Sequence, residues 1–375
     1  MLDPGTTLGS AAMRRQPPDR SSIARSAGLA LLAACALAWA VPGGAQSAAP
    51  GAAADAPDDL AGRSRAMERA RQAVVGVQAV AVDDARSIRT LGRNRGGSGV
   101  VISDDGLVLT IGYLVLEAEQ VELVLDGERS VPARVVGYDM ATGFGLLQAL
   151  APLRIAPAPL APSRALTPDE PLMIASGGED GAVSVAGLVA QRPFSGYWEY
   201  HLDKALVTAP ARRDHSGAGL FNGRGELVGI GSLFLADARS GTTSAAADAN
   251  RQPGNLFVPS ELLPPILAEL TSQGMSRASR RAWIGLNCAE VDGQVRVLRV
   301  SDDSPADVAG LQAGDQILRI DGTEVNALAT LWKALWAGGP AERALTLDIR
   351  RDGQAQTLTV NSVDRSKTLR RAQGI

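Results

Sequence analysis

The sequence predicts a mainly β fold, because short apolar or alternating runs recur along it with turn residues between them. Frequent short strands separated by Gly, Asp and Pro are typical of an all-β barrel or sandwich. Asp104-Asp105-Gly106 is a hairpin signal, since Gly106 tolerates the positive φ that such a turn needs. The predicted strands lie at residues 74–82, 99–103, 107–110, 121–125, 133–138, 172–175, 183–190 and 227–235.

The length of 375 residues allows two or three domains, and 45% hydrophobic with 21% charged residues is ordinary for a globular protein. The formal net charge is -3. Residues 1–45 hold four Arg and two Asp, so the rest of the chain carries 33 basic and 38 acidic side chains. This acidic balance gives no electrostatic reason to expect nucleic acid as a partner.

The N-terminal segment has the three parts of a secretory signal. Four arginines between positions 14 and 25 precede an apolar run at 27–41, and Gly43-Gly44-Ala45 offers small residues for cleavage. The apolar run is shorter than the ~20 residues of a membrane span. We therefore predict a signal peptide at residues 1–45 and an exported protein. Met13 is an alternative start to Met1, because residues 1–12 add nothing to the signal.

A second interpretation of this segment is a bacterial lipobox. Leu32-Ala33-Ala34-Cys35 fits that motif, in which Cys35 would become a lipidated N-terminus and the only membrane anchor. Hydrophobic residues continue to Val41, which favours ordinary export. After cleavage only Cys288 remains, so no intramolecular disulfide can form. Cys288 lies among strand residues and is predicted to be a small buried apolar group.

Composition divides the rest of the chain. Residues 46–65, rich in Ala, Pro, Gly and Asp, are predicted to be a flexible leader, with a short helix at 66–71. Residues 236–255 form a polar loop of small residues that we expect to be mobile. The predicted domains are a first domain at 66–271, a linker at 272–280, a second domain at 281–363 and a tail at 364–375.

Three short segments of the first domain carry a resemblance. Residues 110–114 read Thr-Ile-Gly-Tyr-Leu, residues 138–147 read Tyr-Asp-Met-Ala-Thr-Gly-Phe-Gly-Leu-Leu, and residues 214–220 read Asp-His-Ser-Gly-Ala-Gly-Leu. In this order they resemble the Thr-Asn-Ala-His-Val, Asp-Pro-x-Thr-Asp-Leu-Ala-Leu-Leu and Gly-Asn-Ser-Gly-Gly-Pro-Leu segments of the HtrA/Deg family of trypsin-like serine proteases. The resemblance implies a trypsin-like double β-barrel for residues 66–271.

The resemblance places Ser216 at the position of the catalytic serine, Tyr113 at that of the histidine and Gly143 at that of the aspartate. A serine hydroxyl is almost fully protonated near pH 7 and needs an adjacent base. Tyr113 cannot supply one, because a phenol with an ordinary pKa of about 10 is neutral at that pH. Gly143 has no side chain with which to orient a base. The sequence therefore predicts a degenerate catalytic triad.

Asp214 stands where the resemblance implies a glycine of the oxyanion hole. A carboxylate there puts negative charge close to the developing oxyanion, and its Cβ restricts the backbone. The chain has two histidines, His201 and His215, both beyond the first half of the domain, where this fold supplies its base. His215 adjoins Ser216, but consecutive side chains usually point apart. Without matching Cys or carboxylate spacing, two histidines do not make a metal site, so we predict no metal and no cofactor.

The second domain carries the more specific match. Residues 304–318 read Ser-Pro-Ala-Asp-Val-Ala-Gly-Leu-Gln-Ala-Gly-Asp-Gln-Ile-Leu, and residues 320–325 continue with Ile-Asp-Gly-Thr-Glu-Val. This stretch resembles the centre of a bacterial PDZ domain, a small β-sandwich or barrel with helices. The order of the predicted elements fits that fold: a strand at 295–300, a helix at 328–337, and a final hairpin at 345–350 and 357–360.

A PDZ domain implies peptide recognition. An extended peptide can add as a strand beside the strand that begins at Ile284, while N–H groups of the loop at 283–286 bind its terminal carboxylate. Side chains of the helix at 328–337 would form an apolar wall. The predicted binding residues are Trp283, Ile284, Gly285, Leu286, Leu331, Trp332 and Leu335. Trp332 and Trp336 could instead belong to the core or contact the first domain.

These features together predict an exported HtrA/Deg-like pseudoprotease of the periplasm. It would bind peptides or the C-termini of unfolded proteins and act in envelope quality control or regulation. One alternative is an active serine endopeptidase that uses Ser216 with an unconventional base, and another is a PDZ assembly scaffold. Trimers of this family are held by aromatic residues near the start of the protease domain, but none occurs between Trp39 and Tyr113. The sequence leaves the oligomeric state and the partner open.

Overall fold

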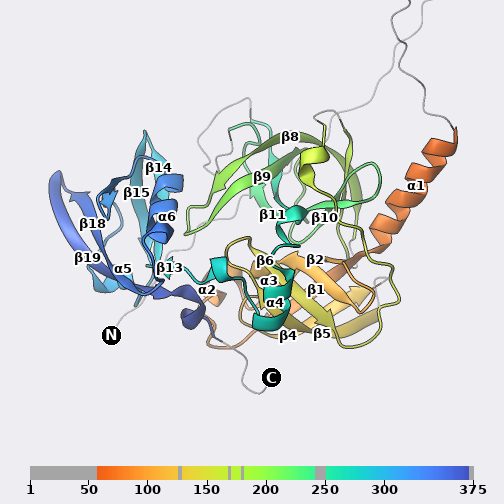
Figure 1. Ribbon diagram of the computed structural model, residues 1–375, viewed down its shortest axis with the longest axis horizontal. Helices are drawn as coiled ribbons and strands as arrows, with labels where there is room; N and C mark the ends of the chain where they lie inside the picture. Colours follow the sequence, from red (N-terminus) through yellow and green to blue (C-terminus); the bar gives the residue numbers. More distant parts are fainter. Residues whose placement is uncertain (1–56, 126–128, 168–169, 179–180, 241–250, 371–375) are drawn as a thin grey trace, which may run out of the picture. The chain divides into compact units, whose positions relative to one another are not determined.

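Six strands between residues 74 and 149 form a closed barrel in the computed structural model (Figure 1). The structure describes residues 57–125, 129–167, 170–178, 181–240 and 251–370. The strands pair in the order β1-β2-β3-β6-β5-β4, and β4 closes the barrel by pairing with β1. The strands are β1 Val74–Ala81, β2 Asn94–Val101, β3 Leu107–Ile111, β4 Ala118–Leu125, β5 Arg129–Tyr138 and β6 Phe144–Ala149.

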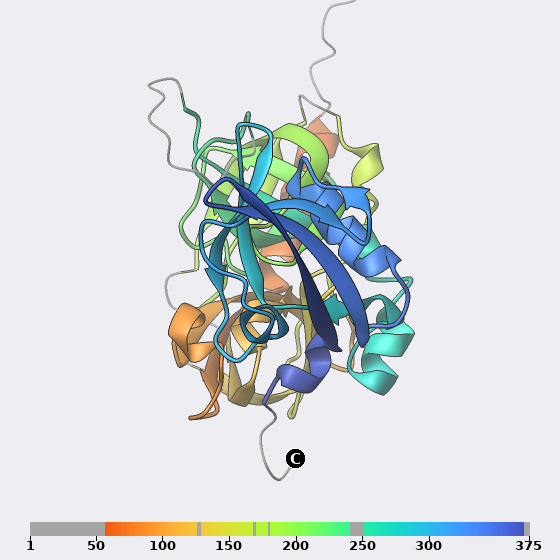
Figure 2. The ribbon, with the colours of Figure 1, turned by 90° about the vertical axis from the view of Figure 1, so that its left-hand side faces the viewer.

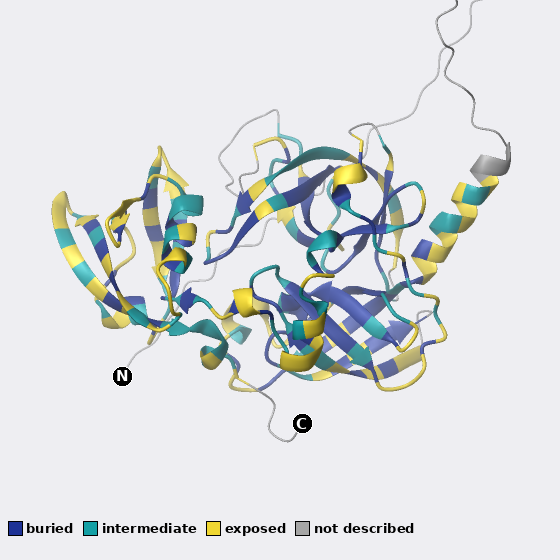
Figure 3. Ribbon diagram, in the orientation of Figure 1, coloured by how far each residue is buried: buried dark blue, intermediate teal, exposed yellow. Residues whose placement is uncertain are grey.

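The turn between β2 and β3 is the hairpin that the sequence predicts. Gly106 has a φ of +85°, and the N–H of Leu107 donates to the hydroxyl of Ser103 at 3.0 Å. Leu109 and Phe144 from the strands of this barrel are completely buried. Successive side chains of a strand face opposite sides, and β4 and β5 each have exposed residues on their outer side. β3 and β6 are instead buried along most of their length (Figure 3).

A second closed barrel follows, with the strand order β10-β11-β12-β9-β8-β7. β8 extends to Ser195, beyond the predicted end at residue 190. β9 was not among the predicted strands, because Asp203 and Lys204 interrupt its apolar pattern. Residues 196–200 connect these two strands, and we call them the β8–β9 tip. The strands are β7 Leu172–Ala175, β8 Val183–Ser195, β9 His201–Ala209, β10 Gly219–Phe221, β11 Leu227–Leu235 and β12 Gly254–Pro259.

A helix precedes the barrels and is longer than the sequence predicts. α1 spans Pro57–Gln72, so it begins inside the segment expected to be a flexible leader. Proline is tolerated in the first turn of a helix, where its missing N–H would be unpaired in any case. Among the residues that the structure describes, no helix is long and apolar enough to cross a membrane. The predicted signal peptide, Cys35 and residues 241–250 of the polar loop lie outside the described residues.

The predicted linker at 272–280 is bonded to the first barrel. Asp139, which follows β5, is completely buried. Its carboxylate accepts hydrogen bonds from the N–H and hydroxyl of Ser276 at 3.1 and 2.5 Å, from the hydroxyl of Ser279 at 2.5 Å, and from the N–H of Thr142 at 2.9 Å. Burial acts to raise the pKa of Asp139, but these hydrogen bonds outweigh it and hold the pKa below its usual value.

Residues 282–364 form a seven-stranded sheet with its own core, in the order β13-β19-β18-β16-β15-β14 with β17 paired to β16 (Figure 2). Cys288 is buried in this core, as the sequence predicts. The strands are β13 Ala282–Trp283, β14 Leu286–Val291, β15 Gln294–Val300, β16 Gln316–Ile320, β17 Thr323–Glu324, β18 Arg343–Arg351 and β19 Gln354–Asp364. The predicted fold class, mainly β with a double barrel followed by a small sheet with helices, is confirmed.

The remaining helices are short, apart from α6, which packs on the sheet of the second domain. A hydroxyl cap begins α5, where Ser304 accepts from the N–H of Asp307 and proline occupies the first turn. The helices are α2 Ile88–Leu91, α3 Gly112–Val115, α4 Leu267–Gln273, α5 Pro305–Val308 and α6 Leu328–Ala337, with 3-10 turns at Ser163–Ala165, Ser260–Leu262, Arg277–Ser279 and Arg365–Thr368.

We expect Asp139→Asn to lower the free energy of unfolding at pH 7 by about 1–3 kcal/mol, because the amide presents N–H groups to buried donors. The folded-state pKa of Asp139 is depressed, so its contribution is present above about pH 4 and is lost as the pH falls through the folded-state pKa. Denaturation with urea at pH 7 and pH 3 should show a difference between wild type and variant that shrinks on acidification.

The matched control is Asp104→Asn, which changes an exposed carboxylate in the β2–β3 turn. This variant should unfold like the wild type at both pH values. Two outcomes would contradict the role assigned to the buried carboxylate. One is an equal decrease in the free energy of unfolding in both variants, and the other is a decrease in Asp139→Asn that is larger at pH 3 than at pH 7.

Candidate functional site

Ser216 lies on a turn between β9 and β10 that both barrels hold. Its carbonyl accepts from the N–H of Ser98 in β2 at 2.8 Å, and the N–H of Gly217 donates to the carbonyl of Gly231 in β11 at 2.8 Å. Gly217 has a φ of +74°, and a Cβ there would lie 1.9 Å from the carbonyl oxygen of Ser98. The turn therefore requires glycine after Ser216 and fixes the serine between the two barrels.

The helix α3 brings Tyr113 to this serine. The phenol oxygen lies 2.8 Å from Oγ of Ser216 and 2.7 Å from the carbonyl oxygen of Ser232. A carbonyl can only accept, so the single phenolic proton goes to Ser232, and Ser216 can donate its own proton to the Tyr113 oxygen. Burial raises the pKa of Tyr113 to about 12. Tyr113 therefore stays protonated at neutral pH and cannot remove the proton of Ser216.

Gly143 lies in the β5–β6 turn, and its carbonyl accepts from the N–H of Gly112 at 2.7 Å, next to Tyr113. Its φ is +85°, a conformation that residues with a side chain rarely adopt. A Cβ at this position would lie 3.0 Å from the hydroxyl oxygen of Tyr200. The ring of Tyr200 is buried, and its hydroxyl donates to the carbonyl of Thr142 at 2.6 Å. Tyr200 thus closes the space that an aspartate side chain would need.

Asp214 is a paired charge. Its carboxylate accepts from Nε of Arg212 at 2.9 Å and from the hydroxyl of Ser176. Burial acts to raise the pKa of Asp214, but the hydrogen bonds from Arg212 and Ser176 outweigh it and hold the pKa below its usual value. The carboxylate therefore stays ionised beside a guanidinium that offsets its charge. The sequence analysis did not identify Arg212, and the effect of Asp214 on an oxyanion stays a prediction.

The hydrogen bonds of the described residues pair neither histidine with Ser216. Nδ1 of His215 lies 3.0 Å from the carbonyl oxygen of Arg212, so this nitrogen carries the proton. Nε2 of His201 lies 3.2 Å from a carboxylate oxygen of Asp203. Burial lowers the pKa of both rings. Within the described ranges, no cluster of His, Cys, Asp or Glu could hold a metal ion.

In the second domain, three consecutive backbone N–H groups converge on one carboxylate oxygen. Ile284, Gly285 and Leu286 donate to Oε1 of Glu199 at 3.2, 2.8 and 3.1 Å. Gly285 has a φ of +89°, and a Cβ there would lie 2.3 Å from the Cβ of Ser304, so only glycine fits. The loop predicted to bind a peptide carboxylate therefore holds a carboxylate of this same chain.

Glu199 belongs to the β8–β9 tip and is only 3% exposed. Its second oxygen, Oε2, is buried without a hydrogen-bond partner among the described residues. Burial raises the pKa of Glu199, against the opposing effects of Arg365 and the three N–H groups. An unpaired buried carboxylate oxygen costs free energy, so the contact is not fully satisfied.

The rest of the β8–β9 tip lies along the second domain. The N–H of Cys288 donates to the carbonyl of Tyr197 at 2.6 Å, and Trp198 pairs antiparallel with Asn287 in β14. From the helix α6, Nε1 of Trp332 donates to the carbonyl of Gly196 at 3.0 Å. The tip therefore takes the place of an added strand between β14 and α6.

The predicted apolar wall is part of the second core. The three residues concerned are completely buried: Leu331, Trp332 and Leu335. Trp332 also contacts the first domain through its indole N–H, one of the alternatives that the sequence left open. Trp336 packs against the core of the second domain, and the guanidinium of Arg281 lies 3.7 Å from the centre of its ring.

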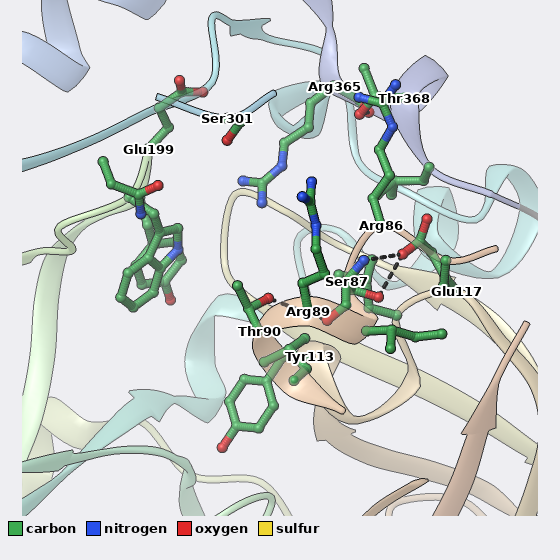
Figure 4. A pocket seen from close by; sticks show the side chains of 18 of the residues that line it. Arg86, Ser87, Arg89, Thr90, Tyr113, Glu117, Glu199, Ser301, Arg365 and Thr368 are labelled. Carbon is green, nitrogen blue, oxygen red and sulfur yellow. Dashed lines mark hydrogen bonds between the residues drawn. The ribbon is translucent and has the colours of Figure 1, made fainter. Parts of the chain in front are cut away.

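A cleft of about 1040 Å³ is lined by residues of both sites. Tyr113 and Ser232 contribute from the barrels, and Trp283 contributes from the second domain. Figure 4 shows Arg365 and Arg89 with their guanidinium groups directed into this cleft, and Arg89 pairs there with Asp302 at 2.5 Å. Tyr113 and Gly143 therefore line the same cleft as Gly285 and Leu286 of the loop at 283–286.

Sequence reasoning missed Glu199 and Tyr200, which close the two sites. Neither belongs to a recognised motif. A signal was nevertheless present, since residues 197–200 read Tyr-Trp-Glu-Tyr, three aromatic residues within four positions of a chain that is 4% aromatic. A concentration of large apolar side chains on a turn indicates a contact surface. In the structure Tyr200 is buried and Trp198 is partly covered, whereas Tyr197 stays 48% exposed.

The comparisons with known proteins agree with both domains. The trypsin-like peptidase domain family matches residues 97–230, and the PDZ domain family matches residues 282–361. Over 297 residues the chain is 28% identical to the periplasmic serine endoprotease DegP of Escherichia coli, a match that covers 74% of this chain and 60% of DegP. Over 279 residues it is 27% identical to HhoA of Synechocystis sp., covering 71% of this chain and 70% of HhoA.

Among solved structures, a variant of the HtrA-type protease AlgW with a tripeptide has the same fold. The two structures superpose with a TM-score of 0.51 at 20% sequence identity, over 81% of this chain and 97% of the AlgW chain. The chain thus combines a trypsin-like peptidase domain with a PDZ domain and is a homologue of the DegP and HtrA serine proteases.

Proposed function

We propose that this chain is an exported pseudoprotease of the periplasm that binds peptide or unfolded-protein segments through its PDZ domain. The observation that carries the proposal is the hydrogen bond between Tyr113 and Ser216, in which a protonated phenol occupies the place of a base. The periplasmic location is supported by the similarity to DegP, which is a periplasmic endoprotease. Quality control or regulation of envelope proteins is the role that fits such a binder.

The size of the expected catalytic defect follows from the missing base. Removal of a triad residue reduces turnover by roughly 10⁴- to 10⁶-fold in well-studied serine proteases. Here glycine also stands at the position of the aspartate, and Tyr200 fills the adjacent space. Binding is therefore the activity that the remaining groups support, since three backbone N–H groups of the PDZ loop converge on one point.

We expect the purified protein to show no cleavage of unfolded casein and no labelling by a fluorophosphonate probe, because Ser216 has no base. Ser216→Ala is the matched control and should behave identically. Casein cleavage by the wild type that disappears in Ser216→Ala would instead establish the alternative, a serine endopeptidase with an unconventional base.

Tyr113→His combined with Gly143→Asp should yield at most weak cleavage of casein. An aspartate at position 143 must adopt the φ of +85° and meets the hydroxyl of Tyr200 at 3.0 Å from its Cβ. Gly143→Ala alone should lower the free energy of unfolding by about 1–2 kcal/mol for the same backbone reason. Efficient cleavage by the double variant would show that neither Tyr200 nor Asp214 obstructs the site.

The full-length protein should bind a peptide with a free, apolar C-terminus more tightly than the same peptide with an amidated C-terminus. A carboxylate forms charge-assisted hydrogen bonds, which are roughly twice as strong as neutral ones. Gly285→Val should weaken binding, because a side chain there meets Ser304. Gly353→Val, at a similar φ of +81° in the open β18–β19 turn, is the matched control.

Calorimetry on the matched pair of peptides decides between the candidate binding modes. Equal affinities for the free and amidated peptides would mean that the groove recognises internal segments, or that the PDZ domain serves as an assembly scaffold.

A further inference from the structure

We infer that the side chain of Glu199 is an internal ligand of the PDZ domain. It occupies the carboxylate position of the groove, and an external C-terminus binds only after it has been displaced. The inference rests on the proposed peptide recognition and specifies how that recognition is regulated.

The direction of the β8–β9 tip is that of a bound peptide. Trp198 pairs antiparallel with Asn287, and the carbonyl of Tyr197 accepts from the N–H of Cys288. Along this strand the chain runs toward the loop at 283–286, where it presents the carboxylate of Glu199. A peptide that adds to a sheet edge uses the same main-chain bonds and ends at the same loop. An external ligand therefore competes with the tip for every one of these groups.

The three N–H groups of the loop at 284–286 are already bonded in the structure. All three N–H groups at positions 284–286 point to Oε1 of Glu199, and the indole N–H of Trp332 is bonded to the carbonyl of Gly196. Glu199 is 3% exposed, so the site is covered as well as occupied. Binding of an external chain and docking of the tip are mutually exclusive.

The internal contact is also displaceable. Oε2 of Glu199 is buried and has no hydrogen-bond partner among the residues that the structure describes, and desolvation of a charged oxygen that gains no hydrogen bond opposes docking. A free C-terminus supplies a carboxylate for the loop and a main-chain carbonyl for Cys288 while Glu199 returns to water. The ligand class that can open the groove is thus a chain with a free α-carboxylate and an extended end.

The measurable consequence is that the apparent affinity equals the intrinsic affinity multiplied by the fraction of molecules in the open state. Removal of the Glu199 carboxylate should therefore increase the affinity of the full-length protein for a free C-terminal peptide by on the order of 10- to 100-fold, the range expected for hydrogen bonds to a charged group. Glu199→Ala should give the full increase. Glu199→Gln, which keeps an acceptor oxygen but loses the charge, should give a smaller one.

The matched control is Asp203→Asn. Asp203 forms an exposed ion pair at 2.6 Å with Lys333 of α6, so its loss removes another contact between the same two domains without touching the loop. Since exposed ion pairs contribute little, the affinity should change by less than about fivefold. A thermal unfolding curve for each variant verifies that it is folded.

A second measurement reports the internal contact without any peptide. Hydrogen exchange at the amides of Ile284, Gly285 and Leu286 should be slow in the wild type and in Asp203→Asn, and should accelerate in Glu199→Ala. Addition of the free peptide to Glu199→Ala should restore the protection, because its carboxylate takes the vacated position.

The two measurements separate failure of this inference from failure of the proposed function. Equal peptide affinities of the wild type and Glu199→Ala would overturn the inference while peptide recognition stands. If no variant binds either peptide, the proposed recognition fails and the competition fails with it. Unchanged amide exchange in Glu199→Ala would reject the internal contact itself.

Discussion

The three hydrogen bonds from the PDZ loop to Glu199 hold the β8–β9 tip in place, and both sites of the molecule depend on that position. On one side of Glu199, Trp198 lies along β14. On the other side, Tyr200 stacks on the ring of Trp198 with centroids 5.6 Å apart and fills the space beside Gly143. Three consecutive residues therefore cover both the loop at 283–286 and the space beside Gly143.

The pair of Tyr113 and Ser216 places a protonated phenol beside the serine hydroxyl. The phenol reaches the serine as a base would, at 2.8 Å, but its proton is already bonded to the carbonyl of Ser232. Proton transfer requires an acceptor with a suitable pKa, and burial moves that of Tyr113 to about 12. The hydroxyl of Ser216 thus serves as a hydrogen-bond donor that satisfies a half-buried phenol, which gives this serine a structural reason to be present.

Local patterns in the sequence predicted the elements whose causes are local. The β2–β3 hairpin follows from Gly106, and most barrel strands follow from short apolar runs bounded by turn residues. The strands β6, β9, β10 and β12 were not predicted. In β9, Asp203 and Lys204 interrupt the apolar pattern. The helix α1 was predicted only at residues 66–71, because its N-terminal part lies in a segment rich in Ala, Pro and Asp.

The candidate sites were predictable only where a motif marks them. Tyr113 and Ser216 could be assigned by their positions in recognisable segments, and the structure brings them together. Glu199 could not, since its partners lie more than 80 positions away and no periodicity links them. Leu331 and Leu335 illustrate a different limit, because the spacing that predicts a groove wall is also the spacing of a core helix.

The packing of Tyr200 beside Gly143 couples substitutions at the two positions. An aspartate at 143 needs both a backbone that glycine favours and room beside the hydroxyl of Tyr200. Tyr200 also stacks on Trp198, next to Glu199, so a smaller side chain at 200 removes a ring contact of the β8–β9 tip. A substitution that makes room at position 143 therefore also alters the surroundings of the carboxylate bound by the loop at 283–286.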